Sequence, residues 1–232
     1  MDASDTATGG GAPDLDLGFT LGLDLPFEET VAWAGEAGFD FVELLLDGPY
    51  ARERIAGDAP AMQETLADAG VDVAVHLPFA IDPGSPFTPV REGVVAEFEA
   101  GMDLAADLGA ELVVFHPSSD AWELGWTEGE CREFVHAALD DLVPAAHGRG
   151  LTPCLENIVS TYYDATAFPE LLERYPDASM TFDTSHALLA GLSGAEMATF
   201  CRVGTEDYDT IALGKRNLEE LLAGVASATD AA

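Results

Sequence analysis

The chain alternates six times between a short apolar run and a longer stretch with helical periodicity. In the stretch 90–108, for example, apolar side chains recur at steps of three or four, which indicates a helix with one buried face. Strands that alternate with such helices predict an α/β domain with a mainly parallel sheet. The apolar runs have strand length, are bounded by Gly, Pro or Asp, and cover 15–23, 39–46, 71–77, 111–116, 151–157 and 179–185.

Glycines at the expected helix ends and a helix-capping motif support the same division into elements. Gly38, Gly70, Gly109 and Gly150 stand just before apolar runs, where they are expected to close the preceding helices. The sequence from Thr127 to Glu130 is typical of a capping box and predicts a helix start.

Two architectures fit this order of elements, an open doubly wound sheet and a closed barrel. The first strand is not followed by GxGxxG, and the GxxxxGK[ST] pattern is absent from the chain. The usual nucleotide-binding signatures of an open sheet are therefore missing, although an open sheet itself is not excluded. Residues 1–14 lack the basic start and apolar stretch of a signal peptide and are expected to form a disordered tail, with 15–232 as one domain.

The charge balance is extreme, with 43 acidic against 9 basic residues and a formal net charge of −34. Such a charge repels itself, and molar salt screens that repulsion because the Debye length falls to about 3 Å. We therefore expect a halophilic protein, the alternative being an acidic face for a basic partner. The charge also argues against nucleic-acid binding, which normally needs a basic surface.

The cellular compartment is expected to be the cytoplasm. Three cysteines stand far apart without a CxxC pair, which is typical of reduced thiols. No apolar run approaches the length of a membrane span.

The chemistry-bearing residues recur where strands end. In a barrel the C-terminal ends of the strands surround the active site. Histidine and carboxylate side chains from different strands are what a divalent-metal site needs. The residues in question are Glu43, His76, His116, Glu156, Asp183 and, three residues further on, His186.

Each of these residues alone is more simply explained as a satisfied polar group or a rim carboxylate. Their joint placement favours a shared metal or catalytic site, because a buried ionised carboxylate is costly unless it is paired or metal-bound. Trp122 and Trp126 fall in the loop after the fourth strand, where they either line a substrate pocket or pack in the core.

At these residues the sequence resembles a known family. The segments VHLPF, VVFHP, LEN and especially FDTSHALLAG are similar to those of the xylose-isomerase-like barrel superfamily, and the resemblance runs from about Leu17 to Cys201. That superfamily includes sugar and sugar-phosphate isomerases and epimerases as well as endonuclease IV, which repairs abasic DNA. The resemblance implies a TIM (β/α) barrel.

The resemblance also implies roles for the residues. Glu156, Asp183 and His186 match metal ligands, and Glu156 and His116 become the catalytic candidates. His76, His116, Glu43 and Trp122 become candidates for substrate binding. The implied cofactor is a divalent metal, Mn²⁺ or Mg²⁺ for an isomerase and Zn²⁺ for an endonuclease.

Three functions remain open on this basis. The first is a metal-dependent sugar or sugar-phosphate isomerase or epimerase, which moves a proton α to a carbonyl. The second is an abasic-site phosphodiesterase like endonuclease IV. The third is a non-catalytic remnant of the family.

The barrel is predicted to be incomplete, with about six βα units instead of eight. Six units extend to about residue 203, and 204–232 is too short for two more. Strands seven and eight are therefore predicted to be missing near 203–205. Strands one and six would then be exposed edges, which a homodimer would cover.

Overall fold

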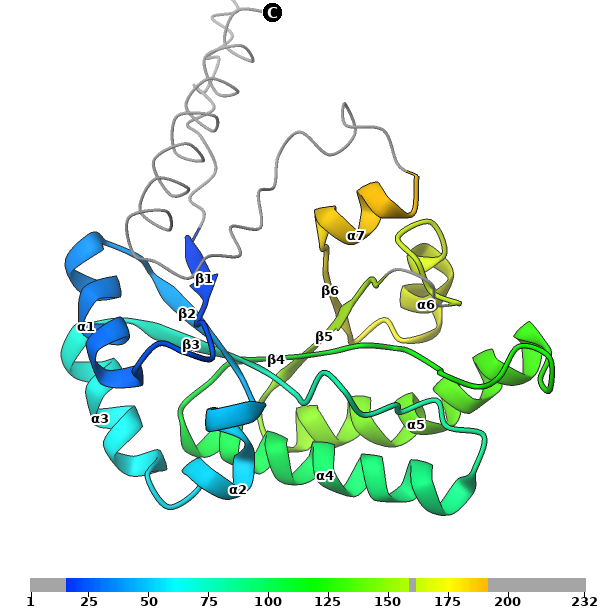
Figure 1. Cartoon of the computed structure of the whole chain (residues 1–232), viewed down its shortest axis with the longest axis horizontal. Helices are drawn as coiled ribbons and strands as arrows, with labels where there is room; N and C mark the ends of the chain where they lie inside the picture. Colours follow the sequence, from blue (N-terminus) through cyan, green and yellow to red (C-terminus); the bar gives the residue numbers. More distant parts are fainter. Residues whose placement is uncertain (1–15, 159–161, 192–232) are drawn as a thin grey trace, which may run out of the picture.

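The computed structural model describes residues 16–158 and 162–191 (Figure 1). The predicted tail at 1–14 and the predicted junction near 203–205 lie outside these residues. The elements in chain order are β1 (Gly18–Thr20), α1 (Phe27–Ala37), β2 (Phe41–Leu45), a 3₁₀ turn η1 (Gly48–Tyr50), α2 (Arg52–Ile55), α3 (Ala59–Ala69), β3 (Asp72–His76), α4 (Thr88–Asp107), β4 (Leu112–Phe115), α5 (Glu128–Gly148), β5 (Thr152–Glu156), α6 (Phe168–Arg174), β6 (Ser179–Thr181) and α7 (Thr184–Leu189).

The strands form one parallel sheet in the order β1-β2-β3-β4-β5-β6, which is also their order in the chain. The sheet curls into part of a barrel, with β1 and β6 at its two ends (Figure 1). The predicted alternation of strands and helices is confirmed, and so is a barrel with six strands in the described part of the chain.

The helices α1 and α3 end at the glycines that were predicted from the sequence. Gly38 ends α1 with φ of 73°, and Gly70 ends α3 with φ of 66°, a left-handed conformation that a side chain would strain. At the start of α5, Thr127 accepts a hydrogen bond from the Glu130 backbone amide while the Glu130 carboxylate accepts one from the amide of Thr127. This is the predicted capping box.

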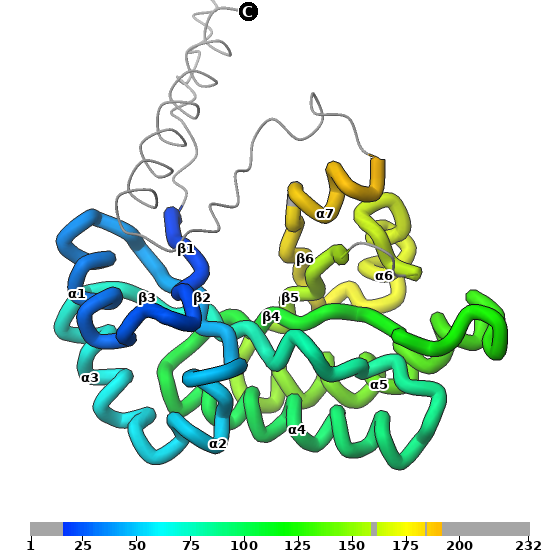
Figure 2. Tube along the Cα trace, viewed as in Figure 1, coloured from blue at the N-terminus to red at the C-terminus, as the bar shows by residue number. Residues whose placement is uncertain are grey.

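Alternation along the strands separates two faces of the sheet. In β2, Val42 and Leu44 are fully buried and belong to the main apolar core, whereas Phe41, Glu43 and Leu45 are only partly buried. The helices α1, α3, α4 and α5 cover the convex side of the sheet (Figure 2). The core therefore lies between helices and sheet, and the other face of the strands lines the concave side.

Among the described residues, no helix is both long and apolar enough to cross a membrane. The single core cluster draws on residues from Phe19 to Tyr175, so the described part of the chain shares one hydrophobic core. The proposed homodimer at the sheet edges remains a prediction.

Close packing of α1 against α3 depends on Gly35. A Cβ at this position would lie 2.5 Å from the backbone oxygen of Ala69. We expect Gly35→Ala to lower the free energy of unfolding by about 1–3 kcal/mol, because one helix must move away from the other. Urea unfolding at constant high salt measures the change.

Gly93 provides the matched control, because it is exposed in α4 and a Cβ there would meet nothing within 4 Å. Gly93→Ala should stabilise the protein by about 0.5–1 kcal/mol, since alanine is the better helix former. Equal effects of the two substitutions would contradict the packing explanation.

Candidate metal centre

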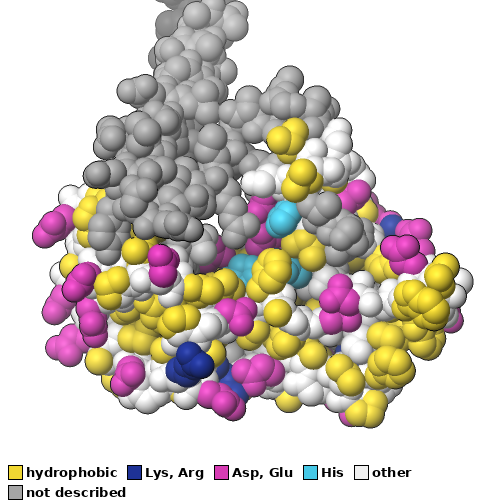
Figure 3. Space-filling model, viewed as in Figure 1, with side chains coloured by type: hydrophobic (Ala, Val, Ile, Leu, Met, Phe, Trp, Pro, Cys, Tyr) yellow, Lys and Arg dark blue, Asp and Glu magenta, His cyan; other side chains and the backbone are white. Residues whose placement is uncertain are grey.

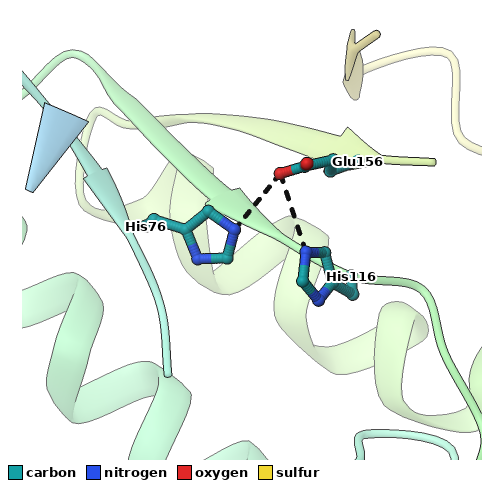
Figure 4. Close-up of side chains that lie close together, drawn as sticks. All are labelled: His76, His116 and Glu156. Atoms are coloured by element: carbon teal, nitrogen blue, oxygen red, sulfur yellow. Dashed lines mark hydrogen bonds and ion pairs between the residues drawn. The ribbon is translucent and has the colours of Figure 1, made fainter. Parts of the chain in front are cut away.

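Three strands bring two histidines and a carboxylate together. His76 is the last residue of β3, Glu156 is the last residue of β5, and His116 directly follows β4. All three side chains are at most 7% exposed, and they converge on the concave side of the sheet (Figure 4). The predicted meeting of these residues at the strand ends is confirmed.

A single oxygen of Glu156 contacts both histidines. Its Oε2 lies 3.2 Å from Nε2 of His76 and 3.6 Å from Nε2 of His116. The two imidazole rings meet edge to face, with centroids 4.9 Å apart. Both Nε2 atoms therefore point to the same place, as ligands of one ion would.

The backbone fixes the orientation of His76. Its Nδ1 lies 2.6 Å from the carbonyl oxygen of Leu77, which can only accept a hydrogen bond. Nδ1 must therefore carry a proton. Nε2 then faces Glu156 either as the second N–H of an imidazolium or as a lone pair. A lone pair beside a carboxylate oxygen is repulsive unless a cation lies between the two.

The contact between His76 and Glu156 shifts the pKa values of the two groups in opposite directions. Burial alone would lower the pKa of His76, but the hydrogen bond to Glu156 and the charges of Glu43 and Glu156 outweigh it and raise the pKa. Burial alone would raise the pKa of Glu156, but its contacts with His116 and His76 hold the pKa well below its usual range. Glu156 is thus ionised although its residue is only 4% exposed.

A second cluster shares the same glutamate. One ligand atom each from Glu156, Asp183 and His186 lies within 4.8 Å of the others, and the same holds for His76, His116 and Glu156. In the second cluster, Nε2 of His186 is 3.8 Å from Oδ2 of Asp183. Nδ1 of His186 is buried and has no hydrogen-bond partner.

Asp183 was expected on the sixth strand, but β6 ends at Thr181 and Asp183 is the N-cap of α7. Its Oδ1 accepts hydrogen bonds from the backbone amides of Ser185 and His186. These bonds end the extended conformation and start the helix, because they satisfy amides that a helix leaves without partners. One carboxylate oxygen caps the helix, and Oδ2 faces His186.

Asn157 links the two carboxylate-bearing segments. Its Nδ2 donates to the carbonyl oxygen of Asp183 at 2.9 Å, and its Oδ1 accepts from the Asp183 amide at 2.8 Å. This pair of bonds holds the loop after β6 against the end of β5. The motif LEN contained this residue, but the sequence did not reveal its partner.

Glu43 and Trp122 do not join the ligand clusters. Glu43 is opposite Thr20 in the register of β1 and β2, and accepts a hydrogen bond of 2.6 Å from its hydroxyl. Glu43 acts on His76 through its charge. Trp122 is in the loop between β4 and α5, 70% exposed, with no hydrogen bond or ring contact to the clusters in the described part of the chain.

Phe79 was not predicted as a site residue. Its ring packs edge to face on His116 with centroids 4.9 Å apart, yet 55% of its surface is exposed. The motif VHLPF contained this phenylalanine, but nothing in the sequence indicated that its ring turns back toward the strand-four histidine. In the space-filling view, histidine side chains reach the surface near the middle of this face (Figure 3).

The residues present fit a divalent metal. His76 donates its outer N–H to a backbone carbonyl, which is the usual arrangement of a metal-binding histidine. The Nδ1 atom of His186 is buried without a hydrogen-bond partner and offers a further nitrogen to a metal. Two imidazoles with a carboxylate suit Zn²⁺ or Mn²⁺, whereas Mg²⁺ prefers oxygen ligands.

Comparison with known proteins agrees with this geometry. The family model described as "xylose isomerase-like TIM barrel" matches residues 31–219. The chain belongs to this family. The predicted resemblance is thereby confirmed, and solved structures with the same fold include sugar epimerases.

Individual relatives are distant. The uncharacterized protein MJ1188 of Methanocaldococcus jannaschii is 30% identical over 122 residues, which cover 50% of this chain and 45% of that protein. The probable endonuclease 4 of Campylobacter concisus is 25% identical over 151 residues, covering 61% of this chain and 52% of that protein. The chain thus spans about half the length of these relatives.

A solved structure extends the comparison to the fold. The structure of D-psicose 3-epimerase in the presence of D-fructose matches with a TM-score of 0.66 over 88% of this chain and 82% of the epimerase. The sequence identity is 13%, so this match supports the fold alone.

Loss of the shared carboxylate should remove metal from both clusters. We expect Glu156→Ala to weaken Mn²⁺ and Zn²⁺ binding by more than the roughly 10–100-fold that loss of an outer-shell partner costs. His76→Ala should weaken only the cluster that contains it. Elemental analysis after dialysis against each metal, followed by chelator competition, measures both effects.

His147→Ala is the matched control, because this histidine is exposed and contacts the Asp177 carbonyl oxygen away from the clusters. It should bind metal like the parent. Unchanged metal content in Glu156→Ala would show that Glu156 is not a ligand.

Metal affinity should also fall as the pH is lowered. A proton and a metal compete for Nε2 of His76. Because the pKa of His76 is raised above its ordinary value of 6.5, protonation begins to weaken metal binding at a pH above 6.5. Affinity should therefore be highest above that raised pKa and decline below it. Chelator competition between about pH 5 and pH 9 tests this, and a flat profile would contradict it.

Proposed function

We propose that the chain is a metal-dependent sugar isomerase or epimerase that moves a proton α to a carbonyl group. The observation that carries the proposal is the convergence of His76, His116 and Glu156 with Asp183 and His186 at the carboxyl ends of the strands. Membership of the xylose isomerase-like family and the fold shared with sugar epimerases support it. Because the chain spans about half the length of its curated relatives, any activity, substrate or partner that it shares with them is part of this proposal.

The residues divide the task by their chemistry. A divalent ion bound here would polarise the carbonyl and hydroxyl oxygens of the sugar. Glu156 is held ionised beside two histidines, which suits a ligand that also orients the substrate near the transferred proton. His116 lies beside it, and histidine is the side chain most often used to carry protons in catalysis.

The second cluster completes the arrangement. Asp183 is fixed in place because it caps α7 and is bonded to Asn157 through its backbone. His186 follows on the first turn of the same helix. Such preorganised groups are positioned to hold metal or substrate without further rearrangement. From β3, His76 is proposed to bind metal or substrate, and from β2, Glu43 is proposed to contribute to substrate binding.

An endonuclease IV-like activity is the second candidate. The two imidazoles that meet Glu156 suit Zn²⁺, and one curated relative is named as a probable endonuclease 4. Against it stands the net charge of −34, because duplex DNA is bound mainly through basic side chains. Cleavage of an abasic duplex with Zn²⁺ would support this activity.

The leading proposal is tested by proton exchange. Full-length protein saturated with Mn²⁺ is incubated with D-fructose in D₂O, and NMR follows deuterium uptake at carbons next to the carbonyl and the appearance of epimers or isomers. We expect Glu156→Gln to reduce the rate by about 10²-fold or more, in the range that acid–base groups contribute.

Glu64→Gln is the control, because Glu64 is exposed on α3. It should exchange deuterium at the parent rate. Equal rates in Glu156→Gln and the parent would remove Glu156 from the mechanism. Absence of both metal binding and exchange in the parent would instead support the non-catalytic remnant.

A further inference from the structure

The loops around the ligand clusters contain no lysine or arginine. This holds for the described parts of the connections that follow the six strands, at 21–26, 46–51, 77–87, 116–127, 157–158 with 162–167, and 182–183. Acidic residues occur in every one of these connections: Asp24, Asp47, Asp82, Asp120, Glu123, Asp164 and Asp183. The rim of the site is therefore anionic.

One described arginine reaches these connections: Arg91 donates to the carbonyl oxygen of Ser85 and lies over the ring of Phe134. Arg54 is exposed on α2. On the face drawn in Figure 3, the few Lys or Arg side chains lie away from the histidines. The arginines that form ion pairs with carboxylates on helices are Arg52, Arg132, Arg149 and Arg174. Arg202, Lys215 and Arg216 lie outside the described residues.

A phosphate group at this rim would meet no lysine or arginine from the described connections themselves. Phosphate esters are normally held by arginine, lysine or a helix N-terminus, and in complete (β/α)₈ enzymes often by loops after strands seven and eight. The net charge of −34 adds a field that repels a dianion.

An apolar surface lies beside the ligands instead. The Phe79 ring contacts His116 on one side and is 55% exposed. Sugar-sized ligands are commonly held between an aromatic surface and a few placed polar groups. The carbon–hydrogen face of a sugar can pack on this ring while its hydroxyl groups reach Glu156 and the histidines.

We infer that the site selects an uncharged sugar over its phosphate ester, with the ring of Phe79 as the apolar wall for the sugar. The inference rests on the proposed function, because it concerns the substrate of the same site. It narrows the substrate class to free sugars.

Calorimetric binding to full-length, Mn²⁺-saturated protein tests the charge selection, with D-fructose and D-fructose 6-phosphate as probes at about 0.2 M and about 2 M KCl. Circular dichroism verifies folding at both salt concentrations. At the lower salt, the phosphate ester should bind roughly tenfold more weakly than the free sugar. The difference should shrink at the higher salt because the repulsion is screened, while the affinity for D-fructose stays constant.

Phe79→Ala tests the apolar wall. It should weaken D-fructose binding by roughly five- to tenfold, the loss expected for one aromatic contact. Phe87→Ala is the matched control, since Phe87 is 64% exposed at the start of α4 and should leave binding unchanged.

The outcomes separate the inference from the proposed function. Tighter binding of the phosphate ester at both salt concentrations would overturn the inference and leave the epimerase proposal standing. Parental affinity in Phe79→Ala would remove the ring from the site. Absence of binding of either probe, with metal bound, would overturn the proposed function and the inference together.

Discussion

The rest of the site depends on the burial of one ionised carboxylate. Glu156 is 4% exposed, and such a charge is tolerated in a protein interior only when it is paired, hydrogen-bonded or metal-bound. His76 and His116 meet this need from two neighbouring strand ends. The parallel register places those ends at the same edge, so the sheet geometry and the charge compensation support each other.

Much of this arrangement could be predicted from the sequence, because it follows local rules. Apolar runs of strand length gave the six strands, and glycines such as Gly38 and Gly70 marked the helix ends through their positive φ. His76 and Glu156 were found because a polar residue at the end of an apolar strand is conspicuous. Parallel strands then bring such residues to one edge whatever the details of packing.

Other features could not be predicted, because they depend on contacts between distant segments. The sequence does not show that the Asp183 side chain ends β6 and caps α7, since an aspartate after an apolar run is compatible with either conformation. The contact of Phe79 with His116 depends on how the loop after β3 folds back. Trp122 suited a pocket by residue type, but its loop leaves it 70% exposed.

The strand order has a consequence for how the protein is made. Each strand pairs with the strand that precedes it in the chain, so the sheet can be assembled in chain order, one strand after another. During synthesis, β3 and β4 can dock before β5 emerges. The residues of the first cluster, His76, His116 and Glu156, are therefore all synthesised before Asp183 and His186, so the first cluster does not depend on α7 for its ligands.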